Sequence, residues 1–570
     1  MNKTTLTQKS FSKPYVQDVL LCAILTTVFA AAVFFNLGDT SFPQTEYTAE
    51  NKLVTIDFGH EVDLKKVVFV YGGEYVGKNE CGFRLYSVSD KYGSLIQRDD
   101  DNNARFHWFV YPFNAVTRYA LLDLRPGVSI LEMGFFDNNG LVEPVDYSKG
   151  ASFLFDEQGL VPNDSTFING CIYDELFYAA TAYEFIHGFE PFEWTHPPLG
   201  KSIIALGISL FGMTPFGWRF MSALFGILML IPVYALSRRL FGSQWFAFFT
   251  AFAFAFDFMS FVHARIANLD IFLVAFIIFS FLFMSEYIRE KPENRLSPKS
   301  LACLGLSGVF VGLAISIKWS GLFAGLGLFV LFALALYDSW VHYSDRKGLF
   351  AKYISKTALW CVLFFIIVPA AIYLISYIPL ANNTGLRWPH DIITLQSEMF
   401  NVQRNFTNKS SFQSSWWTWP LNLHPVICCR DFLEGKGYLS VHMFGNPALW
   451  WGGLLALIWS AKRWMADKDS TARFLCVAWI ALFLPWAFTS RTSYIYYYFP
   501  CVPFLALMIA YFVKTRKERY QMQYALGFCI LVFVLFALFY PVLSGGFAVS
   551  EDYLTGLEWL SGWNFIGTAQ

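Results

Sequence analysis

The sequence has few charged residues for its length, and neither sign is concentrated in one region. Of its 570 residues, 15% are Asp, Glu, Lys or Arg, and 42 basic residues nearly balance 43 acidic ones. Without a pooled basic patch there is no electrostatic footprint for nucleic acid, so no nucleic-acid partner is expected. Because 55% of the residues are hydrophobic and the mean hydropathy is +0.41, the composition indicates a polytopic α-helical membrane protein.

Metal-binding cysteine patterns and internal repeats are also lacking. The ten cysteines show no CxxC spacing, and they fall largely in apolar stretches, where a free thiol behaves as a small hydrophobic group. A structural zinc site is therefore not expected, no residue is assigned to a metal, and the sequence does not decide whether a divalent cation helps. Corresponding broken helices in two halves of the chain, which a secondary transporter should show, are not found.

Eleven apolar runs have the length of about 20 residues that a bilayer core requires. They lie near residues 18–37, 216–236, 244–263, 267–286, 300–317, 319–339, 356–379, 447–464, 472–489, 495–513 and 522–543. The first run lacks a small-residue cleavage site, so we interpret it as a retained signal anchor. Within the third run, Asp257 lies mid-span and should face a helix interface or a polar cavity.

Basic residues gather in the connectors on one side of these spans. The clusters are Lys3/Lys9/Lys13, Arg238-Arg239, Arg289 to Lys299, Arg346 to Lys356, Lys462-Arg463 and Lys514 to Arg519. By the positive-inside rule this side is the cytoplasm. We therefore predict a multi-pass protein of the cell membrane with a cytoplasmic N-terminus, and with its active site and C-terminus on the extracytoplasmic side.

The first long segment on the outer side has the sequence pattern of β-strands rather than that of membrane helices. Residues 52–59, 65–71, 106–110, 118–124 and 129–136 alternate or run apolar over strand lengths, with Gly, Asn and Asp clusters among them. This spacing predicts an antiparallel β-sandwich insert over 41–165. The stretch resembles the discoidin-like, galactose-binding-like jelly roll, for example at Thr55-Ile56-Asp57-Phe58-Gly59. Glycan docking and a spacer packed over the active site both stay open, because a fold does not specify a function.

One acidic pair, Asp174-Glu175, lies just outside the membrane. Carboxylates at a lipid surface cost free energy unless they face water or a site. They could simply complement the dipole of a helix that begins there. Alternatively they are catalytic, and since two neighbouring carboxylates repel and seldom share one task, Asp174 is the first candidate and Glu175 the second.

Several short motifs follow this pair in order along the spans. They are His196-Pro197-Pro198-Leu199-Gly200-Lys201, Trp218-Arg219-Phe220, Ala264 to Asp270, Ile317 to Leu322, Ser414 to Pro420 and Gly445 to Trp451. In this order the chain resembles the protein O-mannosyltransferases, glycosyltransferase family 39, everywhere except in the sandwich. It lacks the MIR repeats of the eukaryotic members, so it resembles a bacterial-type member. The resemblance implies a GT-C fold and a Ser or Thr acceptor on an exported protein.

The chemistry of such a transfer needs one base and stabilisation of a phosphate. A sugar on a polyprenyl phosphate leaves with an anion that is already a weak base, so one carboxylate that takes the proton of an acceptor hydroxyl suffices. The departing phosphate needs cations or hydrogen-bond donors. The residues assigned to donor phosphate or substrate binding are His196, Lys201, Arg219, Arg265, Asp270 and Lys318.

These residues also have ordinary structural interpretations. His196 could be a turn residue before two prolines, and Arg219 could be a snorkelling arginine. Arg265 and Asp270 could be a pair that locks two helices. In the second outer loop, Trp416, Trp417 and Trp419 either anchor the protein at the bilayer surface or contact the sugar or its carrier.

The sequence thus predicts a GT-C type membrane enzyme in five regions. Residues 1–40 hold the cytoplasmic N-terminus and first span, 41–165 the sandwich, 166–380 the catalytic core, 381–446 the second outer loop, and 447–570 the last spans and outer tail. The predicted function is transfer of a sugar, most simply mannose, from a polyprenyl-phosphate donor to a hydroxyl with inversion. The alternatives are glycosylation of a lipid or cell-wall polymer, and a non-enzymatic transporter or sugar receptor. The oligomeric state is not predicted.

Overall fold

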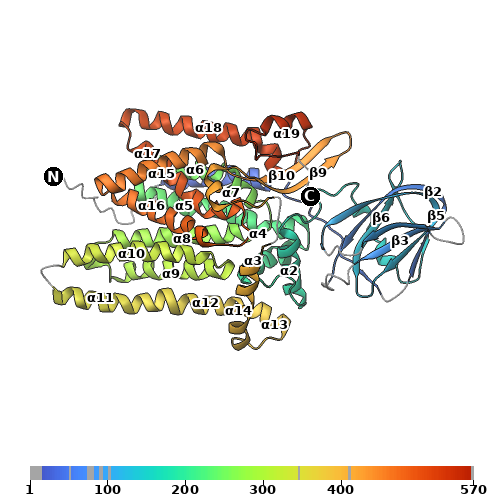
Figure 1. The fold of residues 1–570 in the computed structure, drawn as a ribbon, viewed down its shortest axis with the longest axis horizontal. Helices are drawn as coiled ribbons and strands as arrows, with labels where there is room; N and C mark the ends of the chain where they lie inside the picture. Colours follow the sequence, from blue (N-terminus) through green and yellow to red (C-terminus); the bar gives the residue numbers. More distant parts are fainter. Residues whose placement is uncertain are drawn as a thin grey trace.

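The computed structural model describes residues 16–49, 53–73, 82–88, 94–99, 104–343, 347–407 and 412–566. Figure 1 shows a bundle of long helices along the longest axis and a β-domain beyond one end of it. The shorter helices α2 (Glu175–His187), α3 (Leu199–Phe211), α13 (Ile378–Thr384) and α14 (His390–Asn405) lie at the end of the bundle nearer the β-domain. Lys3, Lys9 and Lys13, which contributed to the topology prediction, lie outside the described residues.

Nine helical segments of the described ranges are long and apolar enough to cross a membrane. The helices that form these segments are α1 (Val16–Phe34), α4 (Pro215–Leu228) with α5 (Leu230–Phe241), α8 (Asp270–Arg289), α9 (Pro298–Ile317), α10 (Gly321–His342), α11 (Lys347–Val362) with α12 (Val368–Ser376) and α13, α16 (Ser470–Phe483), α17 (Val502–Lys514) and α18 (Glu518–Ser544). The predicted eleven spans are therefore approximate: α6 (Gln244–Ala255) is short, and α15 (Pro447–Asp467) is not among the nine.

Asp257 breaks the predicted span over 244–263. It caps the short helix α7 (Phe258–His263) by accepting a hydrogen bond from the Ser260 amide at 3.2 Å. Its other oxygen accepts from the Asn446 amide and from the Trp450 indole N–H, both at 3.0 Å. The buried carboxylate therefore faces the start of α15, which confirms the expectation that Asp257 lies at a helix interface.

The β-domain is an antiparallel sheet with the strand order β1-β6-β2-β5-β3-β4, while β7 pairs with β6 and β8 with β2. The strands are β1 (Tyr47–Thr48), β2 (Leu53–Tyr71), β3 (Phe83–Val88), β4 (Ser94–Asp99), β5 (Trp108–Leu124), β6 (Ser129–Phe136), β7 (Leu141–Val142) and β8 (Asp146–Tyr147). The register between β2 and β5 shifts twice, and such bulges bend long strands. The antiparallel prediction is confirmed, and the jelly-roll resemblance stays a prediction.

The two faces of the sheet have different partners. Along β2, Val67 and Phe69 belong to the domain's own core, whereas Val68 and Val70 belong to the core of the helical bundle, as a side-chain period of two requires. Arg105 adds a buried ion pair to Glu184 of α2, with 2.6 Å between the charged atoms. The β-domain therefore packs against the helical bundle through a shared apolar core and a buried ion pair.

Candidate active site

Asp174 lies directly before α2 with its side chain half-buried. The preceding Tyr173 has a φ of 48°, a left-handed conformation that is uncommon for a non-glycine residue and that clusters at functional sites. The Asp174 carboxylate forms no cap hydrogen bond to α2. Within the described part of the chain it also accepts no other hydrogen bond, so the carboxylate is open to a substrate, while the dipole interpretation of an acid at the start of α2 stays a prediction.

The surroundings of Asp174 favour its protonated form. Burial raises the pKa of Asp174 to about 7, and the negative charges of Asp270, Glu193 and Glu175 act in the same direction. The positive charge of Lys318 acts against this and lowers the pKa. A carboxyl group that titrates near neutral pH is well matched to accept a proton during catalysis.

Lys318 and Asp270 form a buried ion pair beside Asp174, with 2.7 Å between Nζ and Oδ2. Lys318 is the residue after α9, and Asp270 is the first residue of α8. The Lys318 ammonium also lies 5.7 Å from the ring centre of Tyr496 and 6.0 Å from that of Tyr497. The structure thus brings both predicted residues to the same place, at the ends of two adjacent helices.

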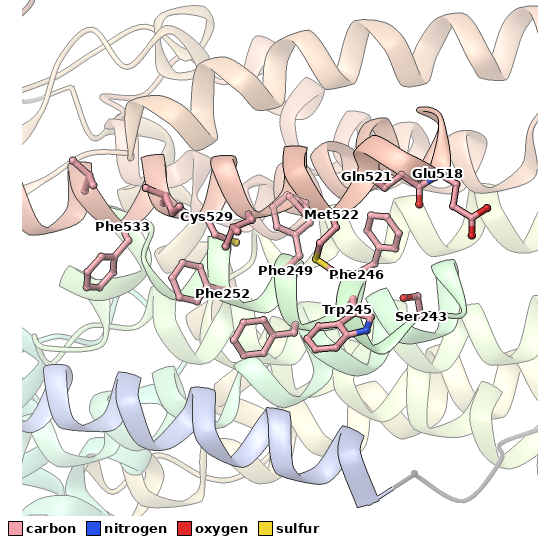
Figure 2. Close-up of a pocket in the computed structure, with 15 residues that line it drawn as sticks. Ser243, Trp245, Phe246, Phe249, Phe252, Glu518, Gln521, Met522, Cys529 and Phe533 are labelled. Atoms are coloured by element: carbon pink, nitrogen blue, oxygen red, sulfur yellow. The ribbon is translucent and has the colours of Figure 1, made fainter.

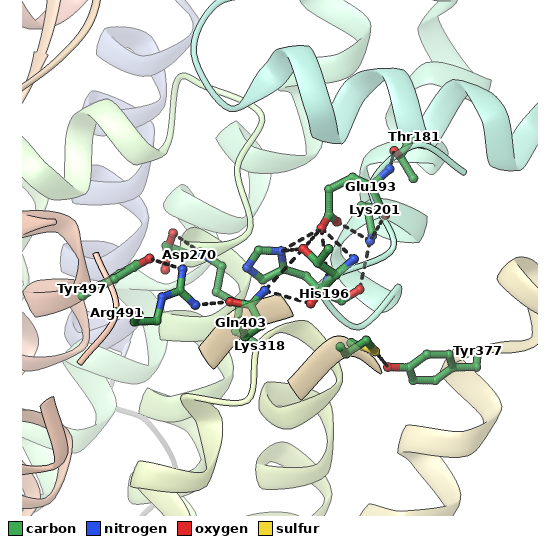
Figure 3. A network of polar contacts seen from close by, with 12 residues as sticks. Thr181, Glu193, His196, Lys201, Asp270, Lys318, Tyr377, Gln403, Arg491 and Tyr497 are labelled. Carbon is green, nitrogen blue, oxygen red and sulfur yellow. Dashed lines mark hydrogen bonds and ion pairs between the residues drawn. The ribbon is translucent and has the colours of Figure 1, made fainter. Parts of the chain in front are cut away.

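A second group of charges surrounds Glu193, which the sequence analysis missed (Figure 3). One of its carboxylate oxygens accepts from Nζ of Lys201 at 2.6 Å, and the other is 3.0 Å from Nδ1 of His196. The Lys201 cation and the hydrogen bonds from Lys201 and His196 hold the pKa of Glu193 far below its usual value, although burial opposes them. Glu193 therefore stays ionised and fixes the His196 ring. Burial lowers the pKa of His196, so the imidazole is neutral near pH 7.

Figure 3 also shows a chain of contacts from this turn to Arg491. Gln403 of α14 donates to the Thr195 carbonyl at 2.9 Å and accepts from the Arg491 guanidinium. Arg491 in turn donates to the Tyr497 hydroxyl at 3.1 Å. Arg491 was not found by sequence analysis, because it precedes a tyrosine-rich stretch and carries no motif. Arg491 and Lys318 nevertheless both lie beside Tyr497.

Glu175 and Arg219 do not belong to the open part of the site, which contradicts their assigned roles. Arg219 donates twice to the Glu175 carboxylate, at 2.7 and 2.6 Å. Its remaining donors bond the carbonyls of Leu37, Phe167 and Gly170. All five donors of the guanidinium are therefore occupied, and none is left for a phosphate. Glu175 is equally committed, since it also accepts from two backbone amides.

Lys201 is also committed to the protein, which contradicts its assignment to the donor phosphate, whereas Arg265 directs its two NH2 groups at backbone carbonyls and keeps a buried, unpaired Nε. Lys201 uses its three donors on Glu193 and on the carbonyls of Glu193 and His196. Arg265 bonds the carbonyls at the ends of α1 and α18, including Val33 and Ser544. The expected Arg265–Asp270 pair does not form, because Asp270 pairs with Lys318.

The three tryptophans have three different environments. Trp419 is fully buried and donates to the Ser414 hydroxyl at 3.0 Å, which supports neither surface anchoring nor sugar contact. Trp416 is half-buried and packs on Phe483. Trp417 is 58% exposed, which suits a surface anchor and leaves its role untested.

Among the residues that the structure describes, one acidic group has the spacing of metal ligands. It comprises Glu132, Asp156 and Glu157 in the β-domain, away from Asp174. Glu132 accepts from the Glu157 amide and the Gln158 side chain, and Glu157 accepts from the amides of Gln44 and Thr45. These carboxylates already have protein donors, so the group does not suggest a cation site.

Comparison with protein families gives two adjacent matches. Residues 211–380 match the family described as dolichyl-phosphate-mannose-protein mannosyltransferase. Residues 388–563 match the C-terminal four-transmembrane region of protein-O-mannosyltransferase. Together they span most of the bundle, while the β-domain lies outside both.

Individual relatives agree with these matches. The polyprenol-phosphate-mannose–protein mannosyltransferase of Mycolicibacterium smegmatis (strain MKD8) is 29% identical over 460 residues, which cover 69% of this chain and 87% of the relative. The Corynebacterium glutamicum protein of the same name is 27% identical, with 65% and 81% covered. The Saccharomyces cerevisiae Pmt1-Pmt2 complex bound to the sugar donor superposes with a TM-score of 0.59 at 15% identity, covering 70% of this chain and 89% of that one. At this identity the likeness shows the fold, which is of the GT-C type.

Proposed function

This chain belongs to the protein O-mannosyltransferase family as a bacterial-type member, and on that basis we propose that it transfers mannose from a polyprenyl-phosphate donor to a Ser or Thr hydroxyl of an exported protein. It is a multi-pass membrane enzyme of GT-C type. The observation that carries the assignment of the site is the open Asp174 carboxylate, with a pKa of about 7, beside the cation of Lys318. None of the other predicted carboxylates combines these two properties, since Glu175 and Asp270 are both ion-paired.

In the proposed reaction Asp174 removes the proton of the acceptor hydroxyl. The acceptor oxygen attacks the anomeric carbon from the face opposite the phosphate, a new glycosidic bond forms, and the bond to the phosphate oxygen breaks. The electron pair leaves with the polyprenyl phosphate, so the configuration inverts. Because the leaving group is a weak base, no general acid is required.

We assign the departing phosphate to Lys318 and Arg491. Arg219 and Lys201 have no free donors for it, and the unpaired Nε of Arg265 is buried. The hydrogen bond to Asp270 uses only one of the three donors of Lys318, and Arg491 is only half-buried. The two cations are linked through Tyr497, which lies near the Lys318 ammonium and accepts from Arg491. Positive charge fixed in a partly dry site stabilises a developing phosphate anion more than it would in water.

We assign His196 to substrate binding. Its Nδ1 lies 3.0 Å from the Glu193 carboxylate and donates to it in the neutral ring. Nε2 is then the nitrogen that can accept a hydrogen bond from a hydroxyl. Figure 3 shows the His196 ring between Glu193 and the group formed by Asp270, Arg491 and Tyr497. Nε2 of His196 suits a sugar or acceptor hydroxyl, because the charge of Lys318 acts on both Asp174 and His196.

The five-region division and the orientation of the chain are part of this proposal. The carbonyl ends of α1 and α18 meet at Arg265, so both helices end at one level of the bundle. This is the end at which Figure 1 places the β-domain and α19 (Glu551–Leu557). If the basic connectors face the cytoplasm, then this end, the site and the outer tail are extracytoplasmic.

The acceptor class can be tested directly. Membranes that contain the enzyme are incubated with polyprenyl-phosphate mannose labelled in the sugar, and the products are separated into protein, lipid and polymer. We expect the label in protein, releasable by β-elimination as an O-linked sugar. Label that moves into lipid or cell-wall polymer instead would support the alternative acceptor, and no transfer to any fraction would favour a receptor or transporter.

A further inference from the structure

An apolar groove runs between α6 and α18, away from the candidate active site (Figure 2). Its volume is about 500 Å³, which is within the range of small-molecule sites. Phe249 at its floor is 2% exposed, whereas Trp245 and Leu526 on its walls are 54% and 59% exposed. The groove is therefore open on its outer side, where the bilayer lies. Its other apolar lining residues include Phe252, Met522, Ile530 and Phe533.

The two ends of the groove differ in polarity. Ser243, Glu518 and Gln521 gather at one end, and the remaining lining residues shown in Figure 2 are apolar or, as with Cys529, weakly polar. The polar end coincides with the basic end of the bundle, because Lys514 donates to the Phe241 carbonyl and Arg289 donates to the Arg239 carbonyl. The segment from Lys514 to Arg519 contains four basic residues and one acidic residue, and Lys517 and Arg519 are exposed.

We propose that this groove binds one anionic phospholipid of the leaflet at the basic end, with an acyl chain between α6 and α18 and the phosphate headgroup at Lys517 and Arg519. Charge supports the headgroup, because four basic residues flank Glu518, the charged residue of the lining, and basic residues next to a membrane helix attract anionic lipids. The length supports a single-leaflet chain. The lining from Glu518 to Val534 spans about 24 Å of helix, which is close to half of a bilayer that measures about 40–45 Å with its headgroups.

The donor's own carrier fits this groove less well. Its phosphate must lie beside Lys318 and Arg491, which belong to the end of the bundle near α2 and α14. The polar end of the groove lies at the start of α18, whose first turn contains Glu518. That is the end of the bundle opposite to the candidate active site. The phospholipid site is therefore independent of the catalytic proposal, and each can fail without the other.

Photocrosslinking tests the site. Full-length enzyme in nanodiscs receives phosphatidylglycerol with a diazirine in its acyl chain, or phosphatidylcholine with the same chain, and adducts are mapped by peptide mass spectrometry. We expect adducts on residues 245–252 and 522–534, several-fold more from the anionic lipid. Ala525→Trp, which fills the groove, should reduce them several-fold. Leu531→Trp is the matched control, because Leu531 is lipid-exposed on the same helix but does not line the groove.

A second variant does not depend on the packing of the groove. Lys517→Gln with Arg519→Gln changes only exposed side chains and should remove the preference for phosphatidylglycerol while phosphatidylcholine still labels the groove. Equal labelling by both lipids in the parent protein, or unchanged adducts in a normally folded Ala525→Trp variant, would overturn the proposal. Displacement by polyprenyl phosphate, or crosslinks between two copies across the groove, would also overturn it.

Discussion

The charges around Asp174 should set the pH at which its base form is available. Transfer needs the carboxylate, so with a pKa of about 7 the rate rises with pH through neutrality and falls about tenfold from pH 8 to pH 6. Asp270 raises this pKa, so Asp270→Asn should move the midpoint to lower pH. Single-turnover transfer measured against pH gives the midpoint. Asp338→Asn, an exposed change on α10, should leave it in place, and a shift of Asp270→Asn to higher pH would contradict this electrostatic picture.

Arg219 and Arg491 should respond differently to the same substitution. Arg219→Met leaves the Glu175 carboxylate buried without its cation, which costs about 3–5 kcal/mol of stability. The expected result is a lower melting temperature and little folded protein. Arg491→Met should leave the melting temperature nearly unchanged but lower transfer about 10²–10³-fold, as expected for loss of a charge that stabilises the leaving anion.

Thermal unfolding in detergent and donor titration together separate the two arginines. If Arg219→Met folds normally and has lost only donor binding, Arg219 binds the donor phosphate after all, and its purely structural role is wrong. The reason sequence analysis misassigned Arg219 is physical. The sequence shows that an arginine lies at the end of a span, but not that three backbone carbonyls from residues 37, 167 and 170 converge on it.

At the scale of single elements, α14 connects two parts of the site. Ile392 and Met399 on its buried face pack against α12 and α13, and Gln396 and Gln403 follow the same face at helical spacing. Gln396 accepts from the Tyr373 hydroxyl of α12 at 2.5 Å, and that hydroxyl accepts from the Trp319 indole beside Lys318. The helix thus reaches the surroundings of both phosphate cations, Lys318 through Trp319 and Arg491 through Gln403.

Gln403→Ala should loosen Arg491 without unfolding the protein. A hydrogen bond to a charged group contributes about 1.5–3 kcal/mol, so we expect transfer to fall about 10–100-fold, mainly through a higher KM for the donor. Asn401→Ala is the control, since Asn401 is exposed on the same helix. Steady-state kinetics at matched expression measures both. Equal effects of the two substitutions would mean that α14 does not position Arg491.

Helices and strands with a periodic apolar pattern were predicted correctly, whereas breaks and single site residues without such a pattern were not. Long apolar spans and alternating strands carry their own periodicity, so the bundle and the antiparallel β-domain could be predicted. The break at Asp257 could be suspected from a charge in a span, but its partners Asn446 and Trp450 come from a distant helix. Glu193 and Arg491 lie only three and six residues from His196 and Tyr497, but they were missed because neither belongs to a recognised motif.

At the scale of the whole molecule, the basic connectors and the candidate site lie at opposite ends of the bundle. If the basic end is cytoplasmic, Trp417 and Phe547 face outward and Arg519 faces inward. Single cysteines at these three positions, in a background without reactive native thiols, can be tagged with a membrane-impermeant reagent in intact cells. We expect labelling at 417 and 547, and at 519 only after the cells are opened. Labelling of 417 and 519 from the same side would exclude this topology.

The β-domain is part of the same rigid unit. Val68 and Val70 share a core with Trp218 and Phe167, and Arg105 is paired with Glu184 of α2, the helix that follows Asp174. Deleting residues 41–160 would expose this apolar face, so loss of activity after deletion would not distinguish glycan docking from a spacer role. Substitutions on its solvent face are the sharper probe of acceptor binding.

The proposed reaction depends on Asp174 as the base of a sugar transfer from a lipid phosphate. The most direct measurement is single-turnover transfer of labelled mannose by Asp174→Asn at matched membrane expression, together with binding of the polyprenyl-phosphate donor. Loss of a positioned base lowers the rate typically about 10²–10⁴-fold, and we expect that loss with donor binding largely intact. Transfer by Asp174→Asn at the parent rate would contradict the account and leave the site without its base.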